Sequence, residues 1–86
     1  MTKELNPVYD CRKSFYGKAI IETSSGAMIL YSYDVPVALY DTRSGELTLG
    51  PKWAYSQTTL RHVKEFLKQQ GLKAESKAQI RKDYIK

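Results

Sequence analysis

The fold is decided by residues 56–72, which read SQTTLRHVKEFLKQQGL. The hydroxyl of Ser56 can accept a hydrogen bond from an N–H group of a first helical turn, so Ser56 is predicted to be an N-cap. Apolar residues recur at helical spacing from Leu60 to Leu67 and form one stripe. Gly71 stands where a left-handed residue commonly ends a helix. The segment therefore predicts an amphipathic helix over about residues 57–70, with its apolar stripe packed on another layer.

That layer is predicted upstream, as four strands between about residues 14 and 49. The strand segments, 14–23, 27–33, 37–41 and 46–49, are rich in aromatic and β-branched residues. Glycine-containing turns separate most of them, and Pro36 is predicted to break the ladder because proline has no N–H to donate. Connections this short join antiparallel neighbours in sequence order. We therefore expect an α+β fold, a four-stranded antiparallel meander with the helix on one face.

Both ends of the chain are predicted to lie outside the domain of residues 13–72. Residues 1–12 show no periodicity, so we expect a loosely held N-terminal arm. Residues 73–86 form a basic tail with a helix-capping pattern and two apolar residues one turn apart. A short helix over about residues 77–85 is expected there, provided that these apolar side chains dock on the domain.

Length and composition restrict the class of protein. Eighty-six residues, with 42% apolar and 27% charged, are typical of one globular domain. No run approaches the roughly 18 apolar residues of a membrane span, and the start lacks the apolar stretch of a secretory signal. A single cysteine and a single histidine exclude an internal disulfide and a structural zinc site. We therefore expect a cytoplasmic protein with no metal, no cofactor and no membrane contact.

The net charge of +5 is unevenly distributed. Residues 1–56 carry six basic and six acidic side chains, whereas residues 57–86 carry eight basic and three acidic ones. Such asymmetry favours an anionic partner. The candidate nucleic-acid or partner-binding residues are Arg61, Lys64 and Lys68 on the main helix, Lys77, Arg81 and Lys82 in the tail, and Lys52 with Trp53 before the helix. The alternative is that these cations only solvate a helix face, which every amphipathic helix requires.

Aromatic residues and the histidine give further candidates. Trp53 beside Lys52 is placed to stack on a base or to anchor a protein interface, although a core role is equally open. Tyr55 is more typical of a core residue. His62 is predicted to be structural, bonded to a carbonyl or a hydroxyl, because no partner for a nucleophile–base pair is evident. No carboxylate pair or metal-ligand cluster is present either, so no catalytic residue is predicted.

Three segments are informative together: KSFYGKA at residues 13–19, Ser32-Tyr33 followed by Val37-Ala38, and YSQTTLRHVKEF at residues 55–66. They resemble a family of small uncharacterised proteins from phages and mobile elements of Gram-positive bacteria. The family-motif residues are Lys13, Tyr16, Lys18, Thr58, Thr59, Arg61 and His62. The resemblance implies a host bacterial cytoplasm and raises the expectation of a host-takeover or anti-defence role.

The sequence thus predicts a protein that acts by binding rather than an enzyme. The first expectation is a phage or mobile-element accessory protein that binds nucleic acid through its basic C-terminal third. The alternative is a protein–protein inhibitor of a host enzyme, an anti-defence or host-takeover factor of the anti-CRISPR kind. An edge strand in so small a sheet can pair with a second copy, so a homodimer is also open.

Overall fold

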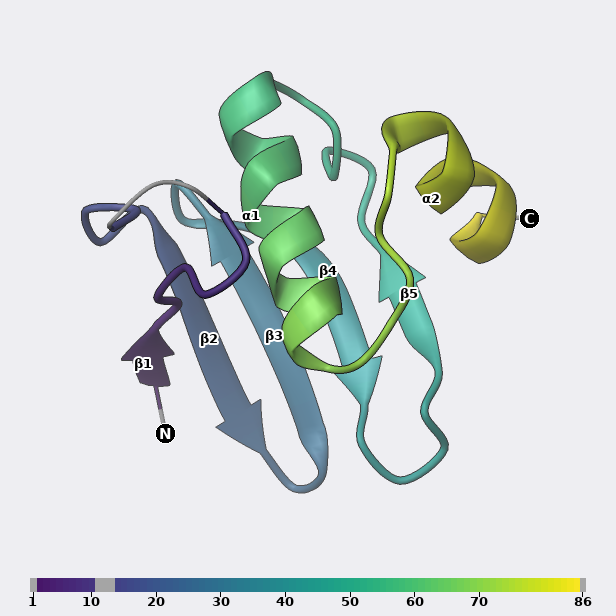
Figure 1. Ribbon diagram of the computed structural model, residues 1–86. Coiled ribbons are helices and arrows are strands. Elements are labelled where there is room, and N and C mark those ends of the chain that lie inside the picture. The colour runs from purple at the N-terminus through teal and green to yellow at the C-terminus, as the bar shows by residue number, and fades with distance from the viewer. Residues whose placement is uncertain (1, 11–13, 86) are drawn as a thin grey trace.

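The computed structural model describes residues 2–10 and 14–85 (Figure 1). Five strands form one antiparallel sheet in sequence order: β1 (Thr2–Glu4), β2 (Ala19–Ser24), β3 (Ala27–Ser32), β4 (Val35–Asp41) and β5 (Leu47–Leu49). Two helices follow, α1 (Gln57–Gln69) and α2 (Lys77–Tyr84). Both cover the same face of the sheet, with α1 across its middle and α2 beside β5 (Figure 1). The predicted α+β class and sequential antiparallel topology are confirmed, with one strand more than expected.

The additional strand comes from the segment that the sequence predicts to be a loose arm. β1 pairs with β2, with Lys3 opposite Ile21. Leu5 follows β1 and is buried in the core, and its N–H donates to the carbonyl of Ala19 at 2.8 Å. A strand of three residues is too short to show a period of two in the sequence. Residues 2–4 of this segment are therefore part of the sheet, and Leu5 is part of the core.

The first predicted strand starts too early. Residues 14–18 form a turn, in which the N–H of Lys18 donates to the carbonyl of Phe15 at 3.0 Å. Tyr16 and Gly17 both have positive φ there, 54° and 75°. The sequence places Gly17 inside a strand, but glycine also fits the left-handed position of a tight turn, and that is its role here. β2 consequently begins at Ala19.

Tyr33 and Asp34 form the tight turn between β3 and β4. Their φ values are 52° and 66°, and positive φ at both positions of a two-residue loop is the type I′ hairpin geometry. Pro36, predicted to break the ladder, lies inside β4. The register of β3 against β4 shifts between Leu30 and Tyr31, directly beside the proline. An irregularity of this kind accommodates a residue that cannot donate to the ladder.

The core fills the space between the sheet and the helices. It includes Ile21 and Leu30 of the sheet, Val63, Phe66 and Leu67 of α1, Trp53 of the preceding loop and Ile80 of α2. Ser56 caps α1 by accepting a hydrogen bond from the N–H of Thr59 at 3.1 Å. Gly71 ends it in a Schellman motif, in which the N–H of Leu72 donates to the carbonyl of Leu67 at 2.9 Å. The main helix is therefore confirmed, including both of its ends.

The short C-terminal helix is also present and docked. Ser76 caps α2, accepting from the N–H of Gln79 at 3.1 Å. Ile80 is fully buried, and the hydroxyl of Tyr84 donates to the carbonyl of Lys73 at 2.9 Å. These are the two side chains on which the sequence makes the helix depend. Within the described residues, neither helix is long and apolar enough to span a membrane.

Candidate functional site

The cations that the sequence assigns to binding lie on three separate surfaces. Lys52 lines a pocket beside the start of β4. Arg61, Lys64 and Lys68 line a groove between α1 and the loop of residues 8–10, and Lys77, Arg81 and Lys82 line a shallow depression on α2. The N-terminal segment lies on one side of α1 and α2 on the other (Figure 1). The charged helix faces thus form distinct surfaces, each of which has to be evaluated separately.

A buried carboxylate organises the groove beside α1. Glu65 is only 2% exposed, and its side chain accepts hydrogen bonds from three successive backbone N–H groups, those of Val8 at 3.0 Å and of Tyr9 and Asp10 at 2.9 Å each. Hydrogen bonds to an ionised acceptor are stronger than neutral ones. We call this arrangement the Glu65 clasp. It fixes the backbone of the loop and leaves the Val8 and Tyr9 side chains exposed.

Two further side chains of α1 tie down the same loop. One turn after Glu65, the amide nitrogen of Gln69 donates to Glu65 at 2.6 Å and to the carbonyl of Asn6 at 2.7 Å. One turn before Glu65, the guanidinium of Arg61 lies 3.4 Å from the carboxylate of Asp10. This ion pair offsets a charge that the sequence treats as available to a phosphate. Arg61 therefore acts first as a tether of the loop.

The groove beside the Glu65 clasp has a volume of about 320 Å³, and we call it the clasp groove. Tyr9 borders it with a side chain that is 59% exposed. Lys64 and Lys68 border it from α1, and neither forms an ion pair with any residue in the described part of the chain. An exposed aromatic ring beside two ammonium groups can stack on a base and bind phosphates. The sequence supplies the lysines, whereas Tyr9 lies in the segment predicted to be loose.

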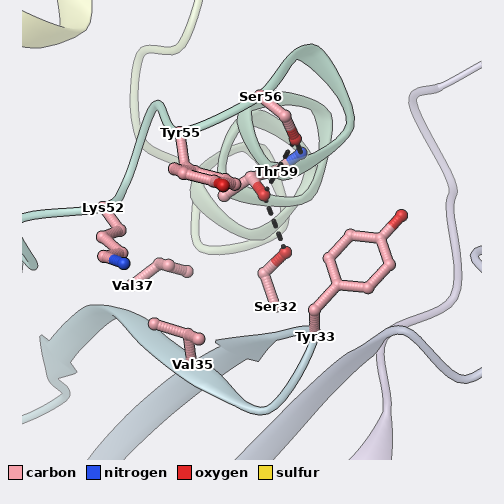
Figure 2. Close-up of a pocket in the computed structure, with 8 residues that line it drawn as sticks. All are labelled: Ser32, Tyr33, Val35, Val37, Lys52, Tyr55, Ser56 and Thr59. Carbon is pink, nitrogen blue, oxygen red and sulfur yellow. Dashed lines mark hydrogen bonds between the residues drawn. The ribbon is translucent and has the colours of Figure 1, made fainter.

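A second cavity, of about 440 Å³, lies between the start of α1 and the β3–β4 turn (Figure 2). Tyr33 and Tyr55 border it and are 49% and 76% exposed, and Figure 2 shows them on either side of the Ser32–Thr59 hydrogen bond. The ammonium of Lys52 lies 5.3 Å from the centroid of the Tyr55 ring. We call this cavity the tyrosine pocket. Its lining is aromatic and aliphatic with one cation, a composition typical of ligand sites.

In the loop before α1, the structure decides the role that the sequence left open for Trp53 and overturns the core position expected for Tyr55. Trp53 is only 5% exposed and belongs to the core, so its indole cannot stack on a base. Tyr55, expected in the core, is exposed. Two successive turns, in which Trp53 N–H donates to the carbonyl of Gly50 and Tyr55 N–H to that of Lys52, set these directions. Trp53 points inward as a result, and Tyr55 is the exposed aromatic ring of this loop.

Hydroxyl groups form the polar floor of the tyrosine pocket. Ser32 donates to Thr59 at 3.2 Å, and Ser56 donates to the same threonine oxygen at 3.2 Å. Ser32 also lies 2.8 Å from Nδ1 of His62, which is fully buried. The ring of Phe15 packs edge-on against His62 at 4.6 Å. His62 is thus a buried residue bonded to a hydroxyl, as predicted, and Ser32 is the partner that the sequence did not reveal.

The Ser32–His62 contact has the atom types of a nucleophile–base pair, but its setting is that of a core hydrogen bond. Ser32 is 2% exposed and His62 is completely buried. The Ser32 hydroxyl is shared with Thr59. A catalytic nucleophile has to reach a substrate atom, and these two side chains have almost no solvent-accessible surface. We assign the pair to the support of the pocket floor.

The other family-motif residues lie near the same end of the sheet. Tyr16 and Lys18 are exposed on their turn, and the N–H of Tyr33 donates to the carbonyl of Lys18 at 2.9 Å, which joins this turn to the wall of the tyrosine pocket. Thr58 is half-buried in the first turn of α1. Lys13 lies outside the described residues. The motif therefore maps mainly to the surroundings of the tyrosine pocket.

Electrostatic shifts and metal-ligand clusters do not single out either cavity. The backbone N–H groups of Arg43 and Ser44 lower the pKa of Asp41, the last residue of β4. Burial and the nearby Asp83 raise the pKa of Tyr84 in α2. Among the described residues, no group of three or more potential ligands could hold a metal ion. What distinguishes the two cavities is their shape, their aromatic side chains and their lysine side chains.

Comparison with known proteins places the chain in a family. The model of one family matches residues 3–82, nearly the whole chain. The chain belongs to this family, the family of unknown function DUF8033. In the other two comparisons, no curated protein and no solved structure matches the chain. The DUF8033 match begins inside β1 and ends inside α2, so it includes residues 3–12 and 73–82, which the sequence leaves outside the domain.

Proposed function

We propose that this DUF8033 protein is an accessory protein that binds single-stranded nucleic acid in the clasp groove. The observation that carries the proposal is the exposed ring of Tyr9 beside the ammonium groups of Lys64 and Lys68. A base stacked on an aromatic side chain contributes about 1–3 kcal/mol, and lysines along the strand bind its phosphates. A single strand fits better than a duplex, because the bases of a duplex stack on neighbouring pairs and leave no free face for a tyrosine ring.

The Glu65 clasp supports the proposal through preorganisation. A ring on a mobile loop would lose conformational entropy on binding, whereas the loop that carries Tyr9 is already held by three hydrogen bonds to Glu65. The Arg61–Asp10 pair adds a further restraint. In this proposal Arg61 positions the loop, and the two lysines supply the phosphate contacts.

Origin and location belong to the same proposal. The resemblance of residues 13–19 and 55–66 to proteins of phages and mobile elements favours a role in the cytoplasm of a bacterial host. The formal charge of +5 is compatible with a polyanionic partner there. These statements rest on the resemblance and on the charge, and the binding proposal can be tested independently of them.

The test is a fluorescence-anisotropy titration of a labelled single-stranded oligonucleotide with charge-reversal variants. The variant Lys64→Glu/Lys68→Glu is compared with Lys77→Glu/Arg81→Glu, which changes the charge equally but on α2. We expect the first to weaken binding on the order of tenfold or more and the second to weaken it much less. Equal losses in both would mean that net charge, and not the clasp groove, governs binding. Wild-type protein without measurable affinity at low salt would exclude the function altogether.

A protein partner is the second candidate, favoured by the uncovered face of the sheet. Both helices lie on one face (Figure 1), and Ile29, Pro36, Leu39 and Pro51 line a shallow apolar groove on the other. Exposed apolar patches on small proteins commonly mark interaction sites. A host-enzyme inhibitor would use this face, and a homodimer is the other arrangement it permits. Leu39→Glu should abolish co-purification of such a partner without affecting oligonucleotide binding, and unchanged co-purification would exclude this face.

A further inference from the structure

We propose that the tyrosine pocket is a separate site for a single nucleotide, a planar heteroaromatic base that carries a phosphate. The site is lined by residues of the β3–β4 turn, β4 and the start of α1, and it shares no lining residue with the clasp groove. It therefore does not depend on the strand-binding proposal. Nothing in the DUF8033 match assigns a ligand to this pocket.

The shape and lining of the pocket favour a flat ligand. Tyr33 and Tyr55 border the space on either side (Figure 2), and both rings are accessible to solvent. Val35 and Val37 of β4 add an apolar wall on the Tyr55 side of the pocket (Figure 2). Aromatic rings of this kind bind the faces of a base by stacked or edge-to-face contact. A volume of about 440 Å³ lies in the range of small-molecule sites and accommodates one nucleotide.

The polar groups of the pocket specify the rest of the ligand. The hydroxyls of Ser32, Ser56 and Thr59 lie together at its floor. Ser32 and Thr59 are only 2% and 3% exposed and support the floor, whereas Ser56 is exposed and keeps acceptor capacity beyond its bonds to Thr59. The Ser56 hydroxyl can therefore pair with the polar edge of a base. Among the described residues, Lys52 is the only charged side chain that lines the pocket, and its ammonium lies 5.3 Å from the centroid of the Tyr55 ring. One fixed cation next to an aromatic wall matches a base with a single phosphate.

Backbone conformation at the pocket wall gives independent support. Tyr33 adopts φ 52° in the type I′ turn, a left-handed conformation that is unfavourable for a bulky residue. Asparagine and glycine are the residues that this turn prefers. Strained residues occur at ligand sites more often than elsewhere. Tyr16 has a similar φ of 54° outside the pocket lining, so the strain at Tyr33 supports the site only together with the position of its ring. The Tyr33 ring both borders the cavity and covers His62 at a centroid distance of 5.8 Å.

The nucleotide can come from two sources, a free mononucleotide or a nucleotide within a strand. The chemistry recognised is the same in both cases. The experiment is an NMR chemical-shift titration of the full chain with AMP, GMP, CMP and UMP, with the matching nucleosides, and with a trinucleotide. A trinucleotide that binds more tightly than every mononucleotide indicates the strand as the source, and equal or weaker trinucleotide binding indicates the free nucleotide.

Two pocket variants and one matched control test the site. Tyr55→Ala should weaken nucleotide binding about 5- to 150-fold, the range that corresponds to the loss of one stacked ring. Lys52→Gln should lower the affinity for nucleotides but leave the affinity for nucleosides, which have no phosphate, unchanged. Tyr16→Ala, at an equally exposed tyrosine outside the pocket lining, should have no effect. Shifts that map elsewhere, equal effects of Tyr55→Ala and Tyr16→Ala, or no binding of any nucleotide at millimolar concentration would overturn the proposal.

A variant of the clasp groove tests strand binding separately from nucleotide binding in the tyrosine pocket. Lys64→Glu/Lys68→Glu changes the clasp groove and leaves every residue of the tyrosine pocket in place. We expect this variant to bind mononucleotides with wild-type affinity while its affinity for longer strands falls. A loss of mononucleotide binding in this variant would contradict a separate site. A wild-type protein that binds mononucleotides but no oligonucleotide would retain the pocket assignment and exclude the clasp groove.

Discussion

Replacing Glu65 by glutamine preserves the size of the side chain and removes its charge, which makes it a direct test of the Glu65 clasp. One carboxylate oxygen accepts from the N–H groups of Tyr9 and Asp10, and the other accepts from Val8 and Gln69. Glutamine has a single oxygen, with an NH₂ group in the place of the other. Whichever way the amide turns, its nitrogen faces two hydrogen-bond donors.

The expected cost follows from this count of donors. Two hydrogen bonds are lost, and the other two become neutral. A hydrogen bond to a charged group contributes about 1.5–3 kcal/mol and a neutral one about 0.5–1.5 kcal/mol. The loop is partly open to water, which can solvate the released donors and reduces the net effect. We therefore expect the free energy of unfolding to fall by about 2–4 kcal/mol, a large part of the roughly 4–13 kcal/mol typical of a chain this length.

Urea unfolding followed by Trp53 fluorescence measures this change, since Trp53 is the single tryptophan and is buried. Amide hydrogen exchange should show faster exchange of the N–H groups of residues 8–10, with the central strands still protected. The matched control is Lys68→Gln, at an exposed site on the same helix. Its free energy of unfolding is expected to lie within about 0.5 kcal/mol of the wild-type value. Glu65→Gln with the stability of the control and unchanged exchange at residues 8–10 would refute the clasp.

Three further predictions concern other parts of the fold. The backbone N–H of Arg43 donates to the Asp41 carboxylate and lowers its pKa below the ordinary value of 3.8. The ionised carboxylate therefore stabilises the fold above pH 3.8, and this stabilisation is lost as the pH falls through the pKa of the folded state. An NMR titration midpoint for Asp41 at or above pH 3.8 would contradict this. Asp34→Gly should raise the free energy of unfolding by about 0.5–1 kcal/mol, because glycine tolerates positive φ; a urea midpoint below wild type would argue against strain. Tyr84→Phe removes the bond to Lys73 and should cost about 0.5–1.5 kcal/mol in the same assay, and no change would mean that α2 docks without it.

The helices could be predicted because their signals are local. The cap at Ser56, the apolar stripe and the glycine ending at Gly71 lie within one segment, and each acts on backbone groups a few residues away. The same holds for α2, where Ser76 and Ile80 give the cap and the docking residue. Local signals of this kind also fixed the antiparallel order of the central strands.

The N-terminal segment could not be predicted, because its partners are distant in the sequence. Residues 8–10 bond to Glu65, more than fifty positions away, and Leu5 is buried against a sheet whose register no local pattern reveals. A glutamate on a basic helix is expected to be a solvated charge. Only the fold shows that the loop surrounds its carboxylate.

The sequence predicts the charged residues of the candidate sites but not the aromatic residues beside them. Lys64 and Lys68 follow from helical spacing, which fixes the direction of a side chain. The loop before α1 has no period, so nothing in the sequence decides that Trp53 points inward and Tyr55 outward. Tyr9 was overlooked because it lies in the segment expected to be loose.

Binding of a single strand in the clasp groove is tested most directly by the salt dependence of the affinity of wild-type protein for a labelled single-stranded oligonucleotide. Two lysines in contact with phosphates predict a slope of about −1.4 in a plot of log K against log salt concentration. The ring of Tyr9 predicts residual affinity that persists as the lysines are screened. Binding that is absent at low salt, or an affinity independent of salt, would contradict the account.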